Sequence, residues 1–132
     1  MKIVLENKDV VLFKQKSKLI DKEAKKYSTD YTCAIGESEG NGVNWKFENI
    51  SAESFIEKVL DVKSGYLKHD IVMYIYNLLN FNMFQLEEQE ASVNVKSDKK
   101  GIALEFNGEL YTFEQLKQGA LKFKDETGVT TL

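Results

Sequence analysis

The chain has 132 residues, a formal net charge of −3, 42% hydrophobic residues and 30% charged residues. This composition is typical of a globular protein, and the length suits a single domain, residues 1–132, built around one core. All 18 basic residues are lysine, so the planar arginine fork that recognises phosphate and guanine is missing. Together with the mildly acidic net charge, this argues against a nucleic-acid partner.

The cysteine content and the N-terminal sequence both indicate a reducing compartment. Cys33 is the single cysteine, which excludes a disulfide framework and a thiolate metal cluster. The N-terminal segment MKIVLENKDVV has neither the apolar stretch nor the cleavage site of a signal peptide. We therefore expect a cytoplasmic protein that has no cofactor and does not span a membrane. The lack of arginine and proline suggests an AT-rich coding genome, as in a low-GC bacterium or its phages.

The first part of the chain is predicted to form a hairpin and then a short helix. Residues 2–6 and 10–14 are rich in β-forming side chains and are separated by a turn composition at 7–9. Over residues 17–27 the apolar period changes to that of a helix, with lysine and acidic residues between the apolar positions.

An alternating pattern predicts a second hairpin. Apolar side chains recur at every second position on both sides of a loop rich in Gly and Asn, at Tyr31, Cys33 and Ile35 and again at Val43, Trp45 and Phe47. Such alternation is typical of antiparallel strands that have one solvated face.

The residues after this hairpin carry the signals of a helix start. Ser51 is a candidate N-cap, and Ile50 and Phe55 are spaced for a hydrophobic staple. We expect this helix to end before Gly65, which has the conformational freedom that a C-terminal stop requires.

The stretch IVMYIYNLLNFNMF, residues 71–84, predicts a central helix that is apolar on two sides. The stronger stripe is expected to pack on the sheet and contains Ile71, Tyr74, Ile75, Leu78 and Leu79. The weaker stripe is either covered by another helix or left open to bind a partner. The second outcome defines a predicted protein interface of Val72, Met73, Tyr76, Phe81 and Met83.

The C-terminal third is predicted to contain strands, a tight hairpin and a last helix. Asn107-Gly108 is a strong signal for a two-residue hairpin turn, which pairs Leu104 with Tyr111 and, one step further out, Ile102 with Phe113. The motif Thr112-x-x-Gln115 is that of a capping box, and its helix should run to about residue 126.

Gly119 lies inside that last helix, where it indicates a close packing contact. The predicted class for the whole chain is α+β: an antiparallel sheet built from hairpins, with three or four helices packed on it.

One spacing resembles that of an EF-hand calcium loop. Glu37, Glu39, Asn41, Gly42 and Glu48 occupy loop positions 1, 3, 5, 6 and 12. Glutamate is long for position 1, position 8 is not aliphatic, and no helical pattern precedes the loop. A hairpin loop with solvated acids is therefore the favoured interpretation, and calcium binding is a weak alternative.

Two other groups of residues have reactive side chains. The acidic run from Glu87 to Glu90 could hold a metal or do acid–base chemistry, although a charged strand edge explains it equally well. Cys33 and His69 would form a nucleophile and base only if the fold brought them together. We expect a buried cysteine and a surface histidine instead.

The function predicted from these patterns is that of a small, non-catalytic protein-binding module. Its partner would be another protein or a second copy of itself, in the manner of an inhibitor, immunity or accessory protein of a bacterium or mobile element. The alternatives are an oligomeric structural protein, or a ligand-binding protein, metal-binding protein or enzyme that uses the 37–48 loop or the Glu87–Glu90 cluster.

Overall fold

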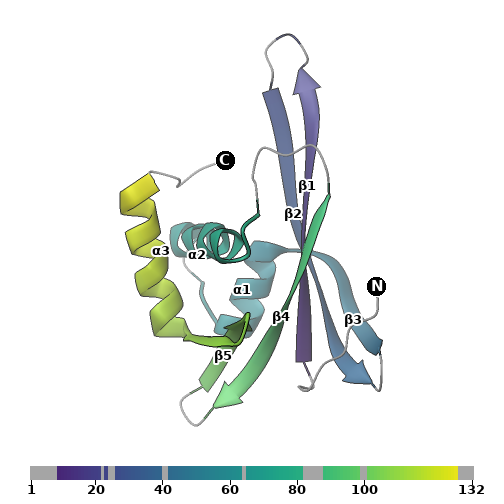
Figure 1. Ribbon diagram of the computed structural model, residues 1–132, viewed down its shortest axis with the longest axis vertical. Coiled ribbons are helices and arrows are strands. Elements are labelled where there is room, and N and C mark those ends of the chain that lie inside the picture. Colours follow the sequence, from purple (N-terminus) through teal and green to yellow (C-terminus); the bar gives the residue numbers. More distant parts are fainter. Residues whose placement is uncertain are drawn as a thin grey trace.

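A computed structural model of the chain describes residues 9–21, 23, 26–39, 42–63, 65–81, 88–98 and 101–127. Within these residues it contains six strands and three helices (Figure 1). In chain order they are β1 Asp9–Asp21, β2 Lys26–Glu39, β3 Gly42–Ser51, α1 Ala52–Leu60, α2 Gly65–Leu78, β4 Gln89–Asp98, β5 Gly101–Phe106, β6 Glu109–Thr112 and α3 Phe113–Thr127.

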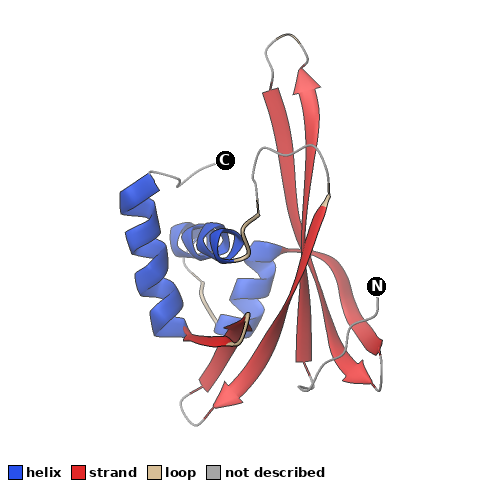
Figure 2. Cartoon of the chain, viewed as in Figure 1, coloured by secondary structure: helices blue, strands red, loops and turns tan. Residues whose placement is uncertain are grey.

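The strands form one antiparallel sheet in the order β3-β2-β1-β4-β5-β6. Most neighbours in the sheet are also neighbours in the sequence, as in hairpins, whereas the pairing of β1 with β4 joins distant parts of the chain. The three helices lie on one side of the sheet (Figure 2). This arrangement confirms the predicted α+β class.

The core fills the space between the helices and the sheet. α2 lies between α3 and the strands (Figure 1) and supplies several of its side chains. The largest side chains that are fully buried in this core are Phe13, Phe55, Ile56, Ile71, Ile75, Tyr76, Leu104 and Leu116. Among the described residues no helix is long and apolar enough to cross a bilayer.

The local turn and cap signals are confirmed. The Ser51 hydroxyl accepts a hydrogen bond from the Ser54 amide at 3.1 Å and so caps α1. Asn107 and Gly108 both have positive φ, 51° and 87°, as a type I′ turn requires, and Leu104 pairs with Tyr111.

The capping box at the start of α3 is also present. The Thr112 amide donates to Gln115 Oε1 at 2.9 Å, and the Gln115 amide donates to Thr112 Oγ1 at 3.3 Å. Because α3 begins at Phe113, that residue leaves the strand ladder, and the predicted pairing of Ile102 with Phe113 is wrong.

The predicted helix over residues 17–27 is also wrong. β1 continues to Asp21 and β2 begins at Lys26, and the two strands pair up to these residues with one irregularity between Leu19 and Asp21. They extend as a two-stranded ribbon beyond the helices (Figure 1). The other half of the predicted first hairpin, residues 2–6, lies outside the described residues.

Two predicted helix boundaries are also revised. α1 ends at Leu60 because Asp61 takes the left-handed conformation, with φ 54°, at the C-cap. Gly65 is not the stop of α1, because it is the first residue of α2. α2 itself ends at Leu78, and Asn80 follows with φ 58°.

The two apolar sides of α2 face different neighbours from those predicted. Tyr76, from the weaker stripe, packs on the sheet, with ring centroids 5.8 Å from Phe13 and 4.3 Å from Tyr31. Tyr74, from the stronger stripe, faces α3, where its ring centroid lies 6.2 Å from that of Phe123. Both sides of the helix are thus covered within the chain.

Candidate binding site

The residues predicted to form a protein interface lie mostly in the core. Val72, Met73 and Tyr76 are 3%, 1% and 1% exposed. Phe81 is half-buried and stacks on Tyr76, with ring centroids 5.0 Å apart. Met83 lies outside the described residues. Val72 and Met73 line a small recess beside Tyr31 and His69. The three buried side chains nevertheless offer almost no exposed surface to a partner, and their role in binding stays a prediction.

The EF-hand-like residues do not form a loop around a common point. Glu37 is paired with Asn44 in the β2–β3 ladder, and its carboxylate lies 3.2 Å from Lys46 Nζ. Glu48 is four residues further along β3 than Asn44, which separates it from Glu37 by roughly 13 Å along the strand. Glu39 ends β2, and Asn41 lies outside the described residues.

The acidic residues near β4 are also spread out. Glu88 forms an ion pair with Lys16 at 3.4 Å, and Glu87 lies outside the described residues. Glu105 sits beside Asn94 in the ladder, four residues from Glu90, and hydrogen bonds from Lys96 and Asn94 hold its pKa below the usual range. In the described part of the chain no three His, Cys, Asp or Glu side chains converge.

His69 and Cys33 have separate environments. His69 Nδ1 lies 3.3 Å from Glu53 Oε1, which links α2 to α1. Cys33 is fully buried in the core, and burial raises the pKa of its thiol. A buried thiol with a raised pKa is a poor nucleophile.

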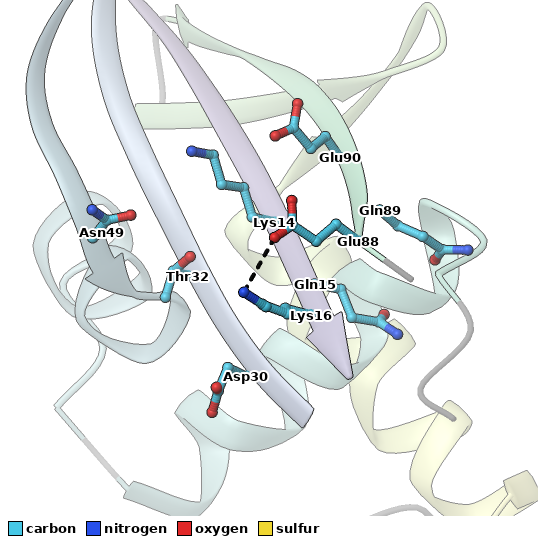
Figure 3. Close-up of a pocket in the computed structure, with 9 residues that line it drawn as sticks. All are labelled: Lys14, Gln15, Lys16, Asp30, Thr32, Asn49, Glu88, Gln89 and Glu90. Carbon is cyan, nitrogen blue, oxygen red and sulfur yellow. Dashed lines mark ion pairs between the residues drawn. The ribbon is translucent and has the colours of Figure 1, made fainter. Parts of the chain in front are cut away.

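A polar trough lies on the face of the sheet opposite the helices, with a volume of about 290 Å³. Its floor is the basic stripe of Lys14 and Lys16 on β1, and acidic side chains of β2 and β4 flank it (Figure 3). Lys16 is already matched by Glu88, and both side chains are about two-thirds exposed. The trough therefore carries both signs of charge in a solvated setting, where ion pairs contribute little energy.

The end of α1, the start of β5 and the start of α3 come together at one corner of the fold (Figure 1). Residues from these places line a second recess, which is mainly apolar. We call it the apolar cleft. Its volume is about 670 Å³, which is in the range of ligand-binding pockets. Its apolar walls are Val59, Leu60, Ile102 and Phe113.

The local structure explains why the core is open at this point. Ile102 lies on the same side of β5 as Leu104 and Phe106, because side chains alternate along a strand. Leu104 and Phe106 are buried, with 0% and 4% of their surface exposed, whereas Ile102 is 39% exposed. α1 has already ended at Leu60 and α3 has only begun at Phe113, so neither helix covers Ile102.

Polar residues also line the apolar cleft. They are Asp61, Thr112 and Glu114, and we call these three residues its polar rim. Thr112 already accepts a hydrogen bond within the α3 capping box. An apolar centre with a polar rim is the usual anatomy of a protein-binding surface.

The sequence does not reveal this cleft. Its residues come from three separate segments, around 60, 102 and 113, and each one lies at the end of an ordinary apolar stripe. Periodicity assigns such residues to the core, and only the relative ends of the helices and strands determine that they stay half-open. No protein-family model, curated protein or solved structure matches the chain.

Proposed function

We propose that this protein is a non-catalytic module that binds another protein through the apolar cleft. The observation that carries the proposal is the exposure of Ile102, 39%, on the floor of a recess whose other apolar walls are half-buried. Burying these side chains would remove apolar surface from water, at roughly 25 cal/mol per Å². The binding energy of protein interfaces comes mainly from such central apolar contacts.

The shape of the cleft favours a protein segment over an enclosed small molecule. Sites for small molecules bury most of the ligand surface, whereas this cleft opens at a corner formed by three elements. An apolar side chain from a partner would fill the space above Ile102, between Leu60 and Phe113. The backbone of the partner would then lie over the polar rim.

The chemistry of the described residues also favours binding over catalysis. The apolar cleft has acidic residues at its rim, and no histidine, cysteine or lysine is found among the described residues that line it. His69 is engaged with Glu53 on a different part of the surface. Binding of a protein segment needs only apolar and polar contacts, which the residues that line the apolar cleft can supply.

The test is to select peptides that bind the immobilised protein from a random displayed library and to measure their affinities for three proteins. These are the wild type, Ile102→Lys and the matched control Leu110→Lys. Leu110 is 52% exposed on the neighbouring strand and does not line the cleft. Both substitutions add the same charge at an exposed apolar position, so both variants should fold.

We expect the selected peptides to bind Ile102→Lys at least tenfold more weakly than the wild type, because a bound apolar side chain would bury the new charge. Leu110→Lys should leave the affinities within a factor of two. A selection that yields no binder, or binders that tolerate both variants equally, would refute the proposed function. Light scattering over a dilution series shows in addition whether the partner is a second copy of the chain.

A further inference from the structure

We propose that the segment which binds the apolar cleft carries a lysine or arginine next to its apolar anchor. This inference rests on the proposed function and concerns the rim of the same site. Among the described residues, the charged ones that line the cleft are Asp61 and Glu114, both of them acidic. Both residues are exposed, and within the described part of the chain neither forms an ion pair.

The end of α1 strengthens the negative potential at this rim. Asp61 is the C-cap of α1, and the last carbonyl groups of a helix carry a partial negative charge that favours cations. Lys58 in the last turn would normally supply that cation. Its ammonium group lies instead over the ring of Phe47, 4.8 Å from the centroid, on the side of α1 that faces β3.

Lys63 does not fill this role either. It follows Asp61 by two residues, is exposed and is not part of the cleft lining. Within the described residues, no cation pairs with Asp61 at the end of α1, where the last helix carbonyls add a partial negative charge.

The opposite wall does not offset this charge. The start of α3 is the positive end of its helix dipole, but Glu114 lies in the first turn and compensates it. The capping box also satisfies two of the main-chain groups there. An acidic segment would thus be repelled by two carboxylates, whereas a basic side chain would find them as acceptors.

The expected size of the effect follows from the exposure of the rim. A solvated ion pair changes affinity by roughly 1.4- to 5-fold, and salt screens it. Two such contacts, at Asp61 and Glu114, would therefore bias selection strongly toward basic segments without supplying most of the affinity. The anchor on Ile102 remains the main contact.

The test uses the peptides selected in the preceding experiment. Each binder is resynthesised with its basic residue changed to glutamine, and both forms are titrated against the wild type and the double variant Asp61→Asn, Glu114→Gln. Asparagine tolerates the left-handed conformation that Asp61 adopts, so the double variant removes charge and keeps the α1 cap. Thermal unfolding confirms that it is folded.

We expect lysine and arginine to be enriched in the selected peptides. Their replacement by glutamine should weaken binding to the wild type 3- to 10-fold and leave binding to the double variant nearly unchanged. The difference should shrink at high salt. Selected peptides without basic enrichment, or an equal loss with both proteins, would overturn this inference. The proposed function would still stand in that case if Ile102→Lys abolishes binding, and both fail if Ile102→Lys has no effect.

Discussion

The ring of Tyr74 on α2 lies directly against Gly119 on α3. A Cβ atom placed on Gly119 would come within 2.3 Å of two ring atoms of Tyr74, which is far closer than van der Waals contact. The ring also packs against Phe123, one turn further along α3. The close contact that a glycine inside a helix suggests is thus present, and it sets how near the two helices lie.

Gly119→Ala should therefore destabilise the protein, although alanine favours a helix over glycine by about 1 kcal/mol. Moving the Tyr74 ring costs roughly 1–3 kcal/mol, as overpacking does, so we expect a net loss in urea unfolding. In a Tyr74→Leu background the same change should stabilise by a few tenths to 1 kcal/mol. A higher melting temperature for Gly119→Ala in the wild type would show that the ring moves freely.

A buried carboxylate joins the same two helices. Asp70 on α2 is 5% exposed, and its Oδ2 lies 3.5 Å from Lys124 Nζ on α3. Lys124→Met should lower the free energy of unfolding by roughly 1–3 kcal/mol, because it removes a charged partner from a buried group. Adding Asp70→Asn should restore part of the loss, since the amide carries no charge. Equal losses in Lys124→Met and the matched surface variant Lys122→Met would contradict this role for the ion pair.

Short-range signals in the sequence predicted the parts of the fold that short-range chemistry determines. The turn at Asn107-Gly108 needs positive φ at both residues, and few residue types accept it. The Ser51 cap and the Thr112–Gln115 box each need one side chain at a fixed spacing from a main-chain amide. Such features are present in the sequence and do not depend on distant parts of the chain.

The strand ribbon formed by residues 17–21 of β1 and 26–27 of β2 was not predictable in this way. Its composition fits the period of a surface helix, but β1 and β2 are already held in register by buried pairs such as Phe13 with Cys33. Each further pair extends the ladder without closing a new loop. Tertiary context thus outweighs the local helix preference.

The candidate site was hidden for a related reason. Two apolar sides of α2 suggested an exposed binding face, yet the sheet covers one and the helices cover the other. The apolar cleft lies around Ile102 instead, one of several exposed apolar side chains, because the helices end short of it. The position of a helix end relative to a strand that is distant in the sequence is determined by the packing of the whole fold.

The last prediction concerns Tyr76, whose hydroxyl is buried. Among the described residues this hydroxyl has no hydrogen-bond partner, although the ring packs well between Phe13, Tyr31 and Phe81. A buried hydroxyl without a partner costs free energy, so Tyr76→Phe should leave the protein as stable as the wild type or up to about 1 kcal/mol more stable. Tyr76→Ala should cost roughly 3–5 kcal/mol, because it removes the ring from the core.

The Tyr76 hydroxyl should also make the free energy of unfolding depend on pH more strongly in the wild type than in Tyr76→Phe. Burial raises the pKa of Tyr76 above its usual range, and the nearby Cys33 and Tyr31 raise it further. An unfolded tyrosine ionises near pH 10. Below that pH both states hold the proton, and above it only the unfolded chain releases it, so the free energy of unfolding falls as the pH rises.

Urea unfolding of the two proteins at pH 8 and pH 11 measures this effect. The wild type should lose more stability than Tyr76→Phe between the two pH values, and the excess loss belongs to the Tyr76 hydroxyl. Tyr31, whose pKa is raised by burial to about 12, is present in both proteins, so its own ionisation adds to the loss of stability in each. Equal losses would mean that the Tyr76 hydroxyl reaches solvent in the folded protein, and a large loss of stability in Tyr76→Phe at pH 8 would mean that it has a hydrogen-bond partner after all.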